Sequence, residues 1–415
     1  MQDAITQGVI FASLLDRPIH ARFDQPAASS DGGALLLKAV DEKLGLSAAL
    51  ARSLRDTRDP SRITHSLSDL LRQRIFALAN GYEDCNDAAR LIADPIARLL
   101  LDRDPIDGHD IASQPTLSRF ENRIDGRSLV RMGHALADTV IAAERRRREG
   151  VRVRRITIDM DPTDDPTHGQ QQLTLFNAHY GTWCYLPVAA FIQFDAEPEQ
   201  HLLAYVVRPG DAHASEGAIP LLGRLIAKLR DAFAGTVLRV RLDGGFATSE
   251  IFDFLDESGV EYVVAISGNS VLRDHAEQLM PAVRARTADS GVTEHDYGEC
   301  EYAAESWNDF RRVIIKAEVV RLGERTAREN PRFVVTNLRQ TPGWVYESVY
   351  CGRGAVENRI KELLYGLNID RTSCHRFFAN QFRALMTAAA YVLFQQLRHE
   401  APRWRTPRWA PCASG

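Results

Sequence analysis

Ile156-Thr-Ile-Asp-Met-Asp161 alternates apolar with polar residues and is followed directly by Pro162. Alternation with a period of two is typical of a β-strand that buries one face. The residues before Arg155 have helical periodicity, so the hydrophobic pattern changes at this point. We therefore expect the first strand of a sheet here, with Asp159 and Asp161 near its carboxyl end.

The residues after Asp161 indicate more strands first, and then an alternation of helices with strands. Strands are expected over residues 183–194, 201–208, 236–242 and 261–266, and helices over 217–234 and 249–258. Short turns favour antiparallel pairing of the first three strands, whereas a helix between two strands favours parallel pairing. This is the order of an RNase H-like core, so the sequence predicts an α/β fold of that kind.

The rest of the chain divides by pattern into segments around this core. Residues 1–30 read as an irregular lead-in, and apolar residues then recur at helical spacing up to a long helix over residues 128–148. We predict a helical DNA-binding region, the first part of the core, a β-strand insertion, the C-terminal core helices and an irregular tail. Their bounds are 1–150, 151–266, 267–345, 346–400 and 401–415.

One segment of the helical region has the pattern of a helix-turn-helix. Ile111-Ala-Ser-Gln-Pro-Thr-Leu-Ser-Arg119 runs from a small-residue turn into a helix, and its polar positions continue to Asn122. The polar face of such a helix enters the major groove of DNA. Arg119 and Asn122 are therefore candidate DNA-binding residues, and an ordinary amphipathic helix is the alternative.

Composition and charge exclude several classes of protein. Of the 415 residues, 45% are hydrophobic and 26% charged, which is ordinary for a globular chain and excludes disorder. We expect no membrane helix and no secretory signal. The net charge is +2 over residues 1–155, −11 over 156–340 and +5 over 341–415. The positively charged terminal segments could bind a polyanion, and the acidic middle segment could bind metal. Solvated surface charge is the simpler explanation of this uneven distribution.

Three acidic residues stand where their side chains could converge. Asp161 and Asp243 end two expected core strands, and Glu357 lies in the first turn of an expected helix. Three carboxylates suit Mg²⁺, or Mn²⁺ as the alternative, and such ions activate a nucleophile for phosphodiester cleavage. We therefore expect a catalytic metal site at these three residues.

Other residues compete for the first position of this set. Asp159 projects from the same strand face as Asp161, and Asp164 and Asp165 follow within the next turn. Asp161 is favoured because the hydroxyl of Thr163 can hold the strand end, while Asp164 and Asp165 suit a turn.

With these residues in place, the sequence resembles the DDE transposases of bacterial insertion sequences. The branch that it resembles is insertion-sequence family thirteen-eighty, in a group marked by a Tyr-(2)-Arg-(3)-Glu-(6)-Lys signature. Tyr350, Arg353 and Glu357 match three signature positions with the correct spacing. The resemblance covers roughly residues 20–397. Further similar stretches are Asp31-Gly-Gly, His65-Ser-Leu to Arg74, Gly81-Tyr-Glu-Asp84, Ser113-Gln-Pro-Thr-Leu-Ser-Arg119, Pro166-Thr-His-Gly169 and Glu357-Asn-Arg-Ile-Lys-Glu-Leu363.

The resemblance implies a metal-binding catalytic triad of Asp161, Asp243 and Glu357. It also implies that Tyr350 and Arg353 contact DNA near the cleaved phosphate. The chain departs from the signature at its last position, which is Leu364, and Lys361 one turn earlier could substitute. The Arg/Trp/Pro tail after residue 400 is a second departure.

The expected function is therefore metal-dependent cleavage at terminal inverted repeats, followed by strand transfer into target DNA. The expected partners are double-stranded DNA and a second copy of the chain, with no membrane, in the bacterial cytoplasm at the nucleoid. Two alternatives remain: a catalytically decayed DNA-binding protein of the same fold, and a metal-dependent nuclease without strand transfer.

Overall fold

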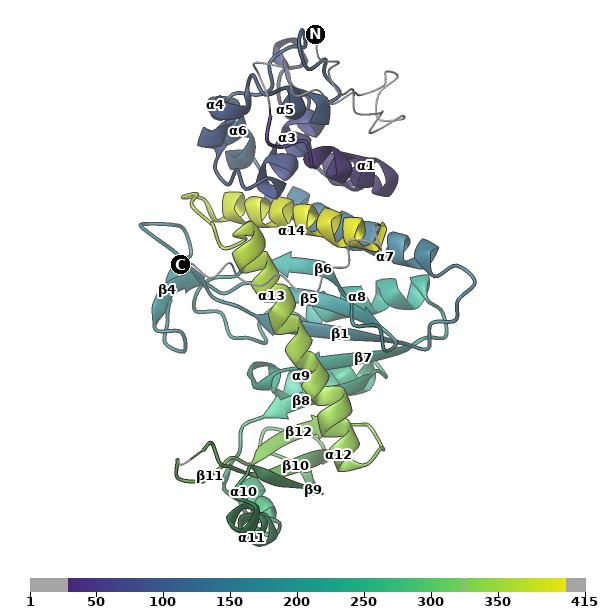
Figure 1. Ribbon diagram of the computed structural model, residues 1–415, viewed down its shortest axis with the longest axis vertical. Coiled ribbons are helices and arrows are strands. Elements are labelled where there is room, and N and C mark those ends of the chain that lie inside the picture. Colours follow the sequence, from purple (N-terminus) through teal and green to yellow (C-terminus); the bar gives the residue numbers. More distant parts are fainter. Residues whose placement is uncertain (1–28, 324, 401–415) are drawn as a thin grey trace, which may run out of the picture.

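The computed structural model describes residues 29–323 and 325–400. The expected lead-in lies almost wholly outside these residues, and the expected tail after residue 400 lies entirely outside them. Within them a large mixed sheet runs through the middle of the molecule, with helices on its sides and above it (Figure 1).

The large sheet has the strand order β11-β10-β12-β8-β7-β1-β5-β6, and β9 pairs with β10. β1 pairs antiparallel with β5 and parallel with β7, and β7 pairs parallel with β8. The strands are β1 (Arg155–Pro162), β5 (Val188–Phe194), β6 (Gln200–Val206), β7 (Val237–Leu242), β8 (Glu261–Ile266), β9 (Glu294–Tyr302), β10 (Arg311–Val320), β11 (Arg328–Glu329) and β12 (Arg332–Thr336).

The strand expected over residues 183–194 is in fact two strands in two sheets. A small sheet of order β2-β4-β3 contains β2 (Asp165–Pro166), β3 (Leu175–Asn177) and β4 (Thr182–Tyr185). The chain passes from β4 to β5 through Leu186 and Pro187. Proline cannot donate to a ladder, so the strand breaks there and the chain changes sheet.

The N-terminal helices pack against the sheet through two long helices. The N-terminal helices are α1 (Ala34–Leu44), α2 (Leu46–Arg52), α3 (Leu67–Ala79), α4 (Ala88–Leu91), α5 (Pro95–Leu100), α6 (Gln114–Asn122) and α7 (Gly126–Arg147). Asp125 caps α7 by accepting a hydrogen bond from the Ser128 amide. Both α7 and α14 (Phe377–Glu400) contact β6, and α14 also contacts α3 (Figure 1).

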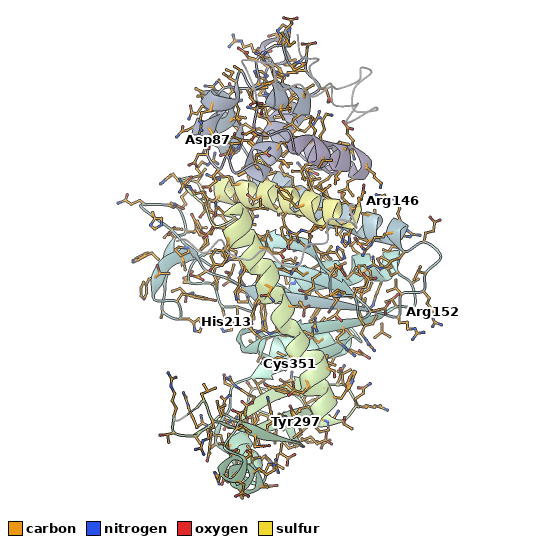
Figure 2. The ribbon with its side chains drawn as sticks, viewed as in Figure 1. Asp87, Arg146, Arg152, His213, Tyr297 and Cys351 are labelled. Carbon is orange, nitrogen blue, oxygen red and sulfur yellow. The ribbon has the colours of Figure 1, made fainter. Side chains whose placement is uncertain are left out.

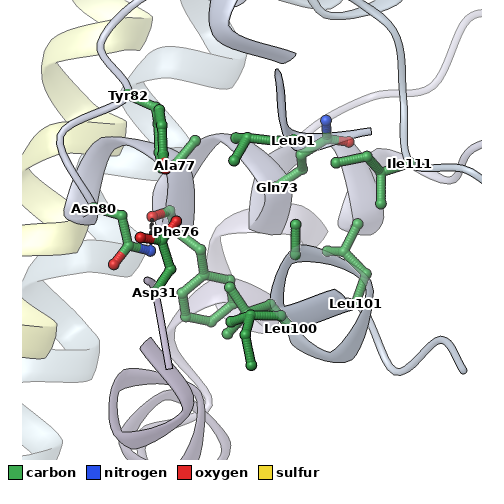
Figure 3. A pocket seen from close by; sticks show the side chains of 12 residues that line it. Asp31, Gln73, Phe76, Ala77, Asn80, Tyr82, Leu91, Leu100, Leu101 and Ile111 are labelled. Atoms are coloured by element: carbon green, nitrogen blue, oxygen red, sulfur yellow. Dashed lines mark hydrogen bonds between the residues drawn. The ribbon is translucent and has the colours of Figure 1, made fainter. Parts of the chain in front are cut away.

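The helix α14 is buried on nearly all sides, which explains its place between two layers. Its buried residues include Phe382, Leu385 and Leu393, and they belong to one hydrophobic cluster that extends from α1 to the central strands. A helix that is apolar all round must be covered on every face. The N-terminal helices and the sheet therefore share a continuous core. A small pocket within these helices is lined mainly by apolar side chains, and the polar Asp31 and Gln73 also line it (Figure 3).

Helices also connect the later strands. They are α8 (Ala218–Ala232) between β6 and β7, α9 (Ser249–Glu257) between β7 and β8, and then α10 (Ser270–Glu277) and α11 (Met280–Ser290) before β9. The sequence did not predict α10 and α11 in the segment 267–345. The strands of that segment continue the large sheet, because β12 pairs with β8.

A nearly unbroken helical run crosses the sheet diagonally (Figure 1). It consists of α12 (Pro342–Trp344), a π-helical turn η4 (Val345–Tyr350), a 3-10 turn η5 (Cys351–Arg353) and α13 (Gly354–Leu367). Asn368 ends the run with a left-handed backbone, φ 47°. Of the helices that the structure describes, none is both long and apolar enough to cross a membrane.

Candidate active site

Asp161 and Asp243 lie side by side at the carboxyl ends of two parallel strands. Met160 of β1 is in register with Leu242 of β7, and the next residue in each strand is an aspartate. Neighbouring strands are about 4.8 Å apart, and residues in register project to the same face. The alternation in β1 and the turn after β7 therefore place two carboxylates together.

The turn after Asp243 is stabilised by this aspartate itself. Asp243 Oδ1 accepts a hydrogen bond of 3.0 Å from the Gly245 amide, which caps a 3-10 turn η3 (Gly244–Phe246). A Cβ on Gly245 would lie 2.7 Å from Ala214 Cβ. The glycine is needed because another segment packs closely against the turn.

Arg353 brings the helical run to these carboxylates. Its Nη1 lies 3.1 Å from Asp161 Oδ2, and its Nη2 donates a hydrogen bond of 3.1 Å to Glu357 Oε1. The contact with Asp161 lacks the alignment of a hydrogen bond, since Nη1 is buried without a hydrogen-bond partner among the described residues. Glu357 lies one helical turn after Arg353 and has 51% of its side chain exposed. A single guanidinium thus contacts two of the three expected carboxylates.

Burial and neighbouring charges shift the pKa values of the site. Burial raises the pKa of Asp161 to about 7, with further contributions from the charges of Asp243 and Glu357, while Arg353 opposes the shift. Burial also raises the pKa of Asp243. Burial raises the pKa of Tyr350, against the effect of the neighbouring Arg353. The five residues therefore form one electrostatically coupled group.

The family model described as Transposase DDE domain group 1 matches residues 11–412. The chain belongs to this transposase family. Among solved structures, the chain is similar to the piggyBac transposase in a cryo-EM structure of its synaptic complex with hairpin DNA. The identity is 10% and the TM-score 0.45, over 91% of this chain and 77% of that chain. Comparison with curated proteins gives no match.

In this transposase the other aspartate of β1, Asp159, contacts a different set of side chains from Asp161. It is fully buried and forms a bidentate ion pair with Arg241, with Nε–Oδ1 of 2.7 Å and Nη2–Oδ2 of 2.6 Å. Gln200 Nε2 donates a third hydrogen bond to it. Asp165 is also buried, against the hydroxyl of Thr372. The geometry thus favours Asp161 over both as the partner of Asp243.

Lys361 and Leu364 differ in their surroundings on α13. Lys361 is exposed one turn after Glu357 and forms no ion pair with the described part of the chain. Leu364 is partly buried and packs against the hydrophobic core. The lysine can therefore reach a ligand at the Glu357 side, whereas position 364 contributes to packing.

Arg119 and Asn122 lie on α6, which is on the other side of α14 from the sheet (Figure 1). The structure therefore does not bring them to the carboxylates. Arg119 is exposed and lines a hollow together with Arg55 and Arg123. The Asn122 amide donates to the Ser118 carbonyl of its own helix, so it is less available than Arg119.

A second group of metal-type ligands occurs at the end of α7. Glu144, His201 and His399 place their ligand atoms within 4.8 Å of one another. Arg147 already contacts all three, at 2.8 Å from Glu144 Oε2, 3.0 Å from His399 Nδ1 and 3.5 Å from His201 Nε2. Arg148 also binds Glu144. Two guanidinium groups supply the positive charge at this cluster, which makes it a poor metal site.

Sequence reasoning missed several residues near the carboxylates. His179 and Tyr180 lie at the turn between β3 and β4 and interact with the charges of the site. Burial raises the pKa of Asp243, and His179 is one of the groups that oppose this shift. Burial is also the main cause of the raised pKa of Tyr180, to which Asp161 and Asp243 contribute. Arg241 and Gly352 contact each other beside the site. Their neighbours come from distant parts of the chain, so no local pattern revealed them.

Proposed function

We propose that this chain is an insertion-sequence transposase of family thirteen-eighty, in the group with the Tyr-Arg-Glu-Lys signature. Its membership of a DDE transposase family supports the general activity. The order β6-β5-β1-β7-β8, with three antiparallel strands followed by two parallel ones, supports an RNase H-like core. Tyr350, Arg353 and Glu357 support the more specific assignment.

The observation that carries the proposal is the bridge made by Arg353. Asp161 and Asp243 follow paired residues of adjacent strands, and Arg353 joins Asp161 to Glu357 at 3.1 Å on each side. The three carboxylates come from three distant segments of the chain. We propose that they form the catalytic triad.

The donor set fits a divalent cation. Members of DDE families generally use divalent metals, and three carboxylates offer the hard oxygen ligands that Mg²⁺ and Mn²⁺ prefer. Burial is the main cause of the raised pKa of Asp161, and the charges of Asp243 and Glu357 add to it; a cation would offset both effects. Bound metal supplies activation of water and stabilisation of the leaving oxygen. Asp161, Asp243 and Glu357 would hold it.

The neighbouring side chains would position the DNA. Arg353 has a buried Nη1 with no aligned acceptor in residues 29–323 and 325–400, and a guanidinium binds phosphate oxygens in a bidentate manner. Tyr350 lies beside it, and Lys361 can add a phosphate contact from the exposed side of α13. Water would break the phosphodiester bond at the end of the element and leave a 3′-OH, which then attacks target DNA.

We propose that the N-terminal helices bind the terminal inverted repeats through α6. Arg119 and Asn122 are the predicted contacts, and Arg55 and Arg123 add positive charge to the same hollow. Two element ends must be held together for transposition, so we expect a homodimer on double-stranded DNA. Action on chromosomal DNA would place the protein at the bacterial nucleoid, in the cytoplasm.

Cleavage of a labelled duplex that carries the element's inverted repeats tests this function. We expect nicking at the element boundary with Mg²⁺, none with a chelator, and joined products when target DNA is added. Asp243→Asn should lower cleavage at least about a hundredfold, because even changes beside metal ligands cost about 10- to 100-fold. Asp289→Asn, at an exposed position of α11, is the matched control.

Binding and thermal stability are measured on the same variants. Mg²⁺ should raise the Tm of the wild type and of Asp289→Asn but not that of Asp243→Asn, because a cation that binds the folded state stabilises it. An Asp243→Asn variant that cuts normally would refute the triad. Cleavage without joined products would indicate a nuclease. Binding without cleavage would indicate a decayed enzyme, which Leu364 in place of the signature lysine favours.

A further inference from the structure

We propose that Arg241 is a positioning residue that fixes the helical run carrying Tyr350, Arg353 and Glu357 to the sheet carrying Asp161 and Asp243. The effect on catalysis rests on the proposed function, whereas the mechanical link does not. Arg241 belongs to β7, two residues before Asp243, and only 5% of its side chain is exposed.

The sheet side of this link is held by three acceptor contacts. Arg241 and Asp159 are paired residues of the adjacent parallel strands β7 and β1, and their side chains form the bidentate ion pair. Arg241 Nη2 also donates a hydrogen bond of 3.0 Å to Gln193 Oε1 of β5. A guanidinium held bidentately by a buried carboxylate has little freedom to turn.

The helical side of the link is a single backbone carbonyl. Arg241 Nη1 donates a hydrogen bond of 3.1 Å to the Val349 carbonyl, and both groups are buried. Val349 belongs to the π-helical turn η4, next to Tyr350 and one helical turn before Arg353. Irregular turns of this kind mark places where the regular ladder of helical hydrogen bonds changes, and they are frequent at functional sites. Arg241 thus binds the run where its geometry changes.

Gly352 provides an independent observation. A Cβ on this residue would lie 2.3 Å from Arg241 Nη1. Non-bonded atoms do not approach a Cβ this closely, so either the guanidinium or the backbone at residue 352 would have to shift. Glycine is therefore the residue that lets the guanidinium pass against the backbone between Tyr350 and Arg353. Around Gly354, two residues later, no described atom outside its chain neighbours and its own helical backbone lies within 4 Å of the Cβ position. The requirement for glycine is specific to the contact with Arg241.

These contacts give the buried Asp159 a role that differs from that of Asp161. Asp159 accepts hydrogen bonds from Arg241 and Gln200, and Gln395 of α14 in turn donates to the Gln200 carbonyl. The charge on Asp159 therefore orients Arg241, while Asp161 is available at the strand end. Two aspartates of one strand thus serve the same site, one by positioning and one by contact.

A double-mutant cycle between Arg241 and Gly352 tests the proposal. Gly352→Ala should push the guanidinium away from Val349 and shift Arg353 and Glu357, since misplacement by about 1 Å can cost about 100-fold in rate. We expect the cleavage rate at saturating DNA to fall at least about tenfold, with the affinity for duplex within about twofold of wild type. Gly354→Ala, the matched control, should change neither.

Arg241→Lys retains the charge opposite Asp159 but cannot bind Asp159 and Val349 together. We expect it to lower the rate like Gly352→Ala, and we expect the double variant to be no worse than either single one. In a protein that carries Arg241→Lys, Gly352→Ala should cause no further loss of cleavage rate, because the lysine ammonium is smaller than the guanidinium and leaves room for the alanine methyl group. Additive losses would overturn the proposal, as would equal effects of Gly352→Ala and Gly354→Ala.

Hydrogen exchange of residues 345–357 provides a readout that needs no catalysis. Both single variants should exchange this segment at least about tenfold faster than wild type, while the central strands keep their protection. If the wild type fails to cleave but the exchange results hold, the proposed function is wrong and the positioning link stands. If cleavage is normal and exchange unchanged in Gly352→Ala, the link is wrong and the function stands.

Discussion

The Arg353 guanidinium lies 3.1 Å from a carboxylate oxygen of Asp161, and this contact joins the C-terminal helical run to the first strand of the sheet. The same group binds Glu357 through its second nitrogen. A positive charge thus lies between carboxylates that would hold a cation in the proposed site. Metal and Arg353 must therefore share, or compete for, the same oxygen atoms.

This competition predicts opposite effects of Arg353→Gln on metal binding and on cleavage. Loss of the guanidinium removes a charge that repels cations, so Mg²⁺ should raise the Tm at lower concentrations than in wild type. Cleavage should fall at least about tenfold because the proposed phosphate contact of Arg353 would be lost. The titration is made at about pH 8, above the Asp161 pKa of about 7.

Arg328→Gln serves as the control for this experiment, because Arg328 is exposed on β11 and forms no ion pair with the described residues. It should match wild type in both measurements. A parallel loss of Mg²⁺ response and cleavage in Arg353→Gln would show that Arg353 supports the metal site instead of competing with it.

The sequence predicted the central strands well because their patterns are local. Alternation and apolar runs marked the strands of the large sheet up to β8, although they did not separate β4 from β5, and intervening helical patterns marked α8 and α9. The helix α11 was missed because it buries few apolar residues, among them Met280 and Val283. For lack of an apolar helical pattern, the sequence predicted mainly strands in residues 267–345.

The arginines of β7 show what a local pattern cannot reveal. In Val237-Leu-Arg-Val-Arg-Leu242 the alternation suggests that Arg239 and Arg241 face solvent, yet both are buried. Their carboxylate partners, Glu261 and Asp159, lie on adjacent strands. The expected parallel pairing of these strands gives neither their register nor the side chains that meet across them, so the proposed positioning role of Arg241 required the structure.

Leu364→Lys should increase cleavage if the signature lysine is what this chain lacks. Leu364 is partly buried, so a lysine there must extend along the helix to bring its charge to solvent near Lys361. We expect a rise of about tenfold, the gain from one added phosphate contact, at a cost of about 1 kcal/mol in stability. Tyr365→Lys, at a position that is 81% exposed, is the matched control. Equal rates in both variants would mean that Lys361 already serves this function.

Arg119→Gln should weaken binding of duplex DNA without affecting the carboxylate site. Arg119 is exposed on α6, beyond α14 from the proposed catalytic residues. Each phosphate contact releases about one counterion when the protein binds DNA. The slope of log affinity against log salt concentration should therefore become less steep by about 1 in this variant. The Mg²⁺-dependent rise in Tm should stay as in wild type. An unchanged slope and affinity would favour an ordinary amphipathic helix.

A charged surface elsewhere on the molecule supplies the comparison for Arg119. Arg146 and Arg152 project from the end of α7 and the segment that follows it (Figure 2), and both are exposed. Arg146→Gln removes the same charge at a different place. If DNA binding is a general effect of positive charge, both variants should lose affinity equally; if α6 is the recognition element, only Arg119→Gln should do so.

Asp165→Asn should change how stability depends on pH. Burial raises the pKa of Asp165 to about 8 from a model-compound value of 3.8, although the hydroxyl of Thr372, 2.9 Å from both oxygens, opposes the shift. The folded protein thus holds this proton over a range where the unfolded chain has released it. The stabilising contribution is complete below the unfolded pKa and is lost as pH rises through the folded value.

The wild type should therefore lose stability relative to Asp165→Asn between about pH 5 and pH 8, by about 1.4 kcal/mol for each pH unit over which only the folded protein holds the proton. An asparagine keeps a polar group beside Thr372 and does not titrate, so its Tm should fall less over this range. Tm values of both proteins at the two pH values give the difference directly, and other titrating groups cancel. Asp289→Asn, with its exposed side chain, should follow the wild type. Parallel pH profiles for wild type and Asp165→Asn would mean that Asp165 is ionised in the folded protein, which would require a counter-charge that its hydrogen bond to Thr372 does not provide.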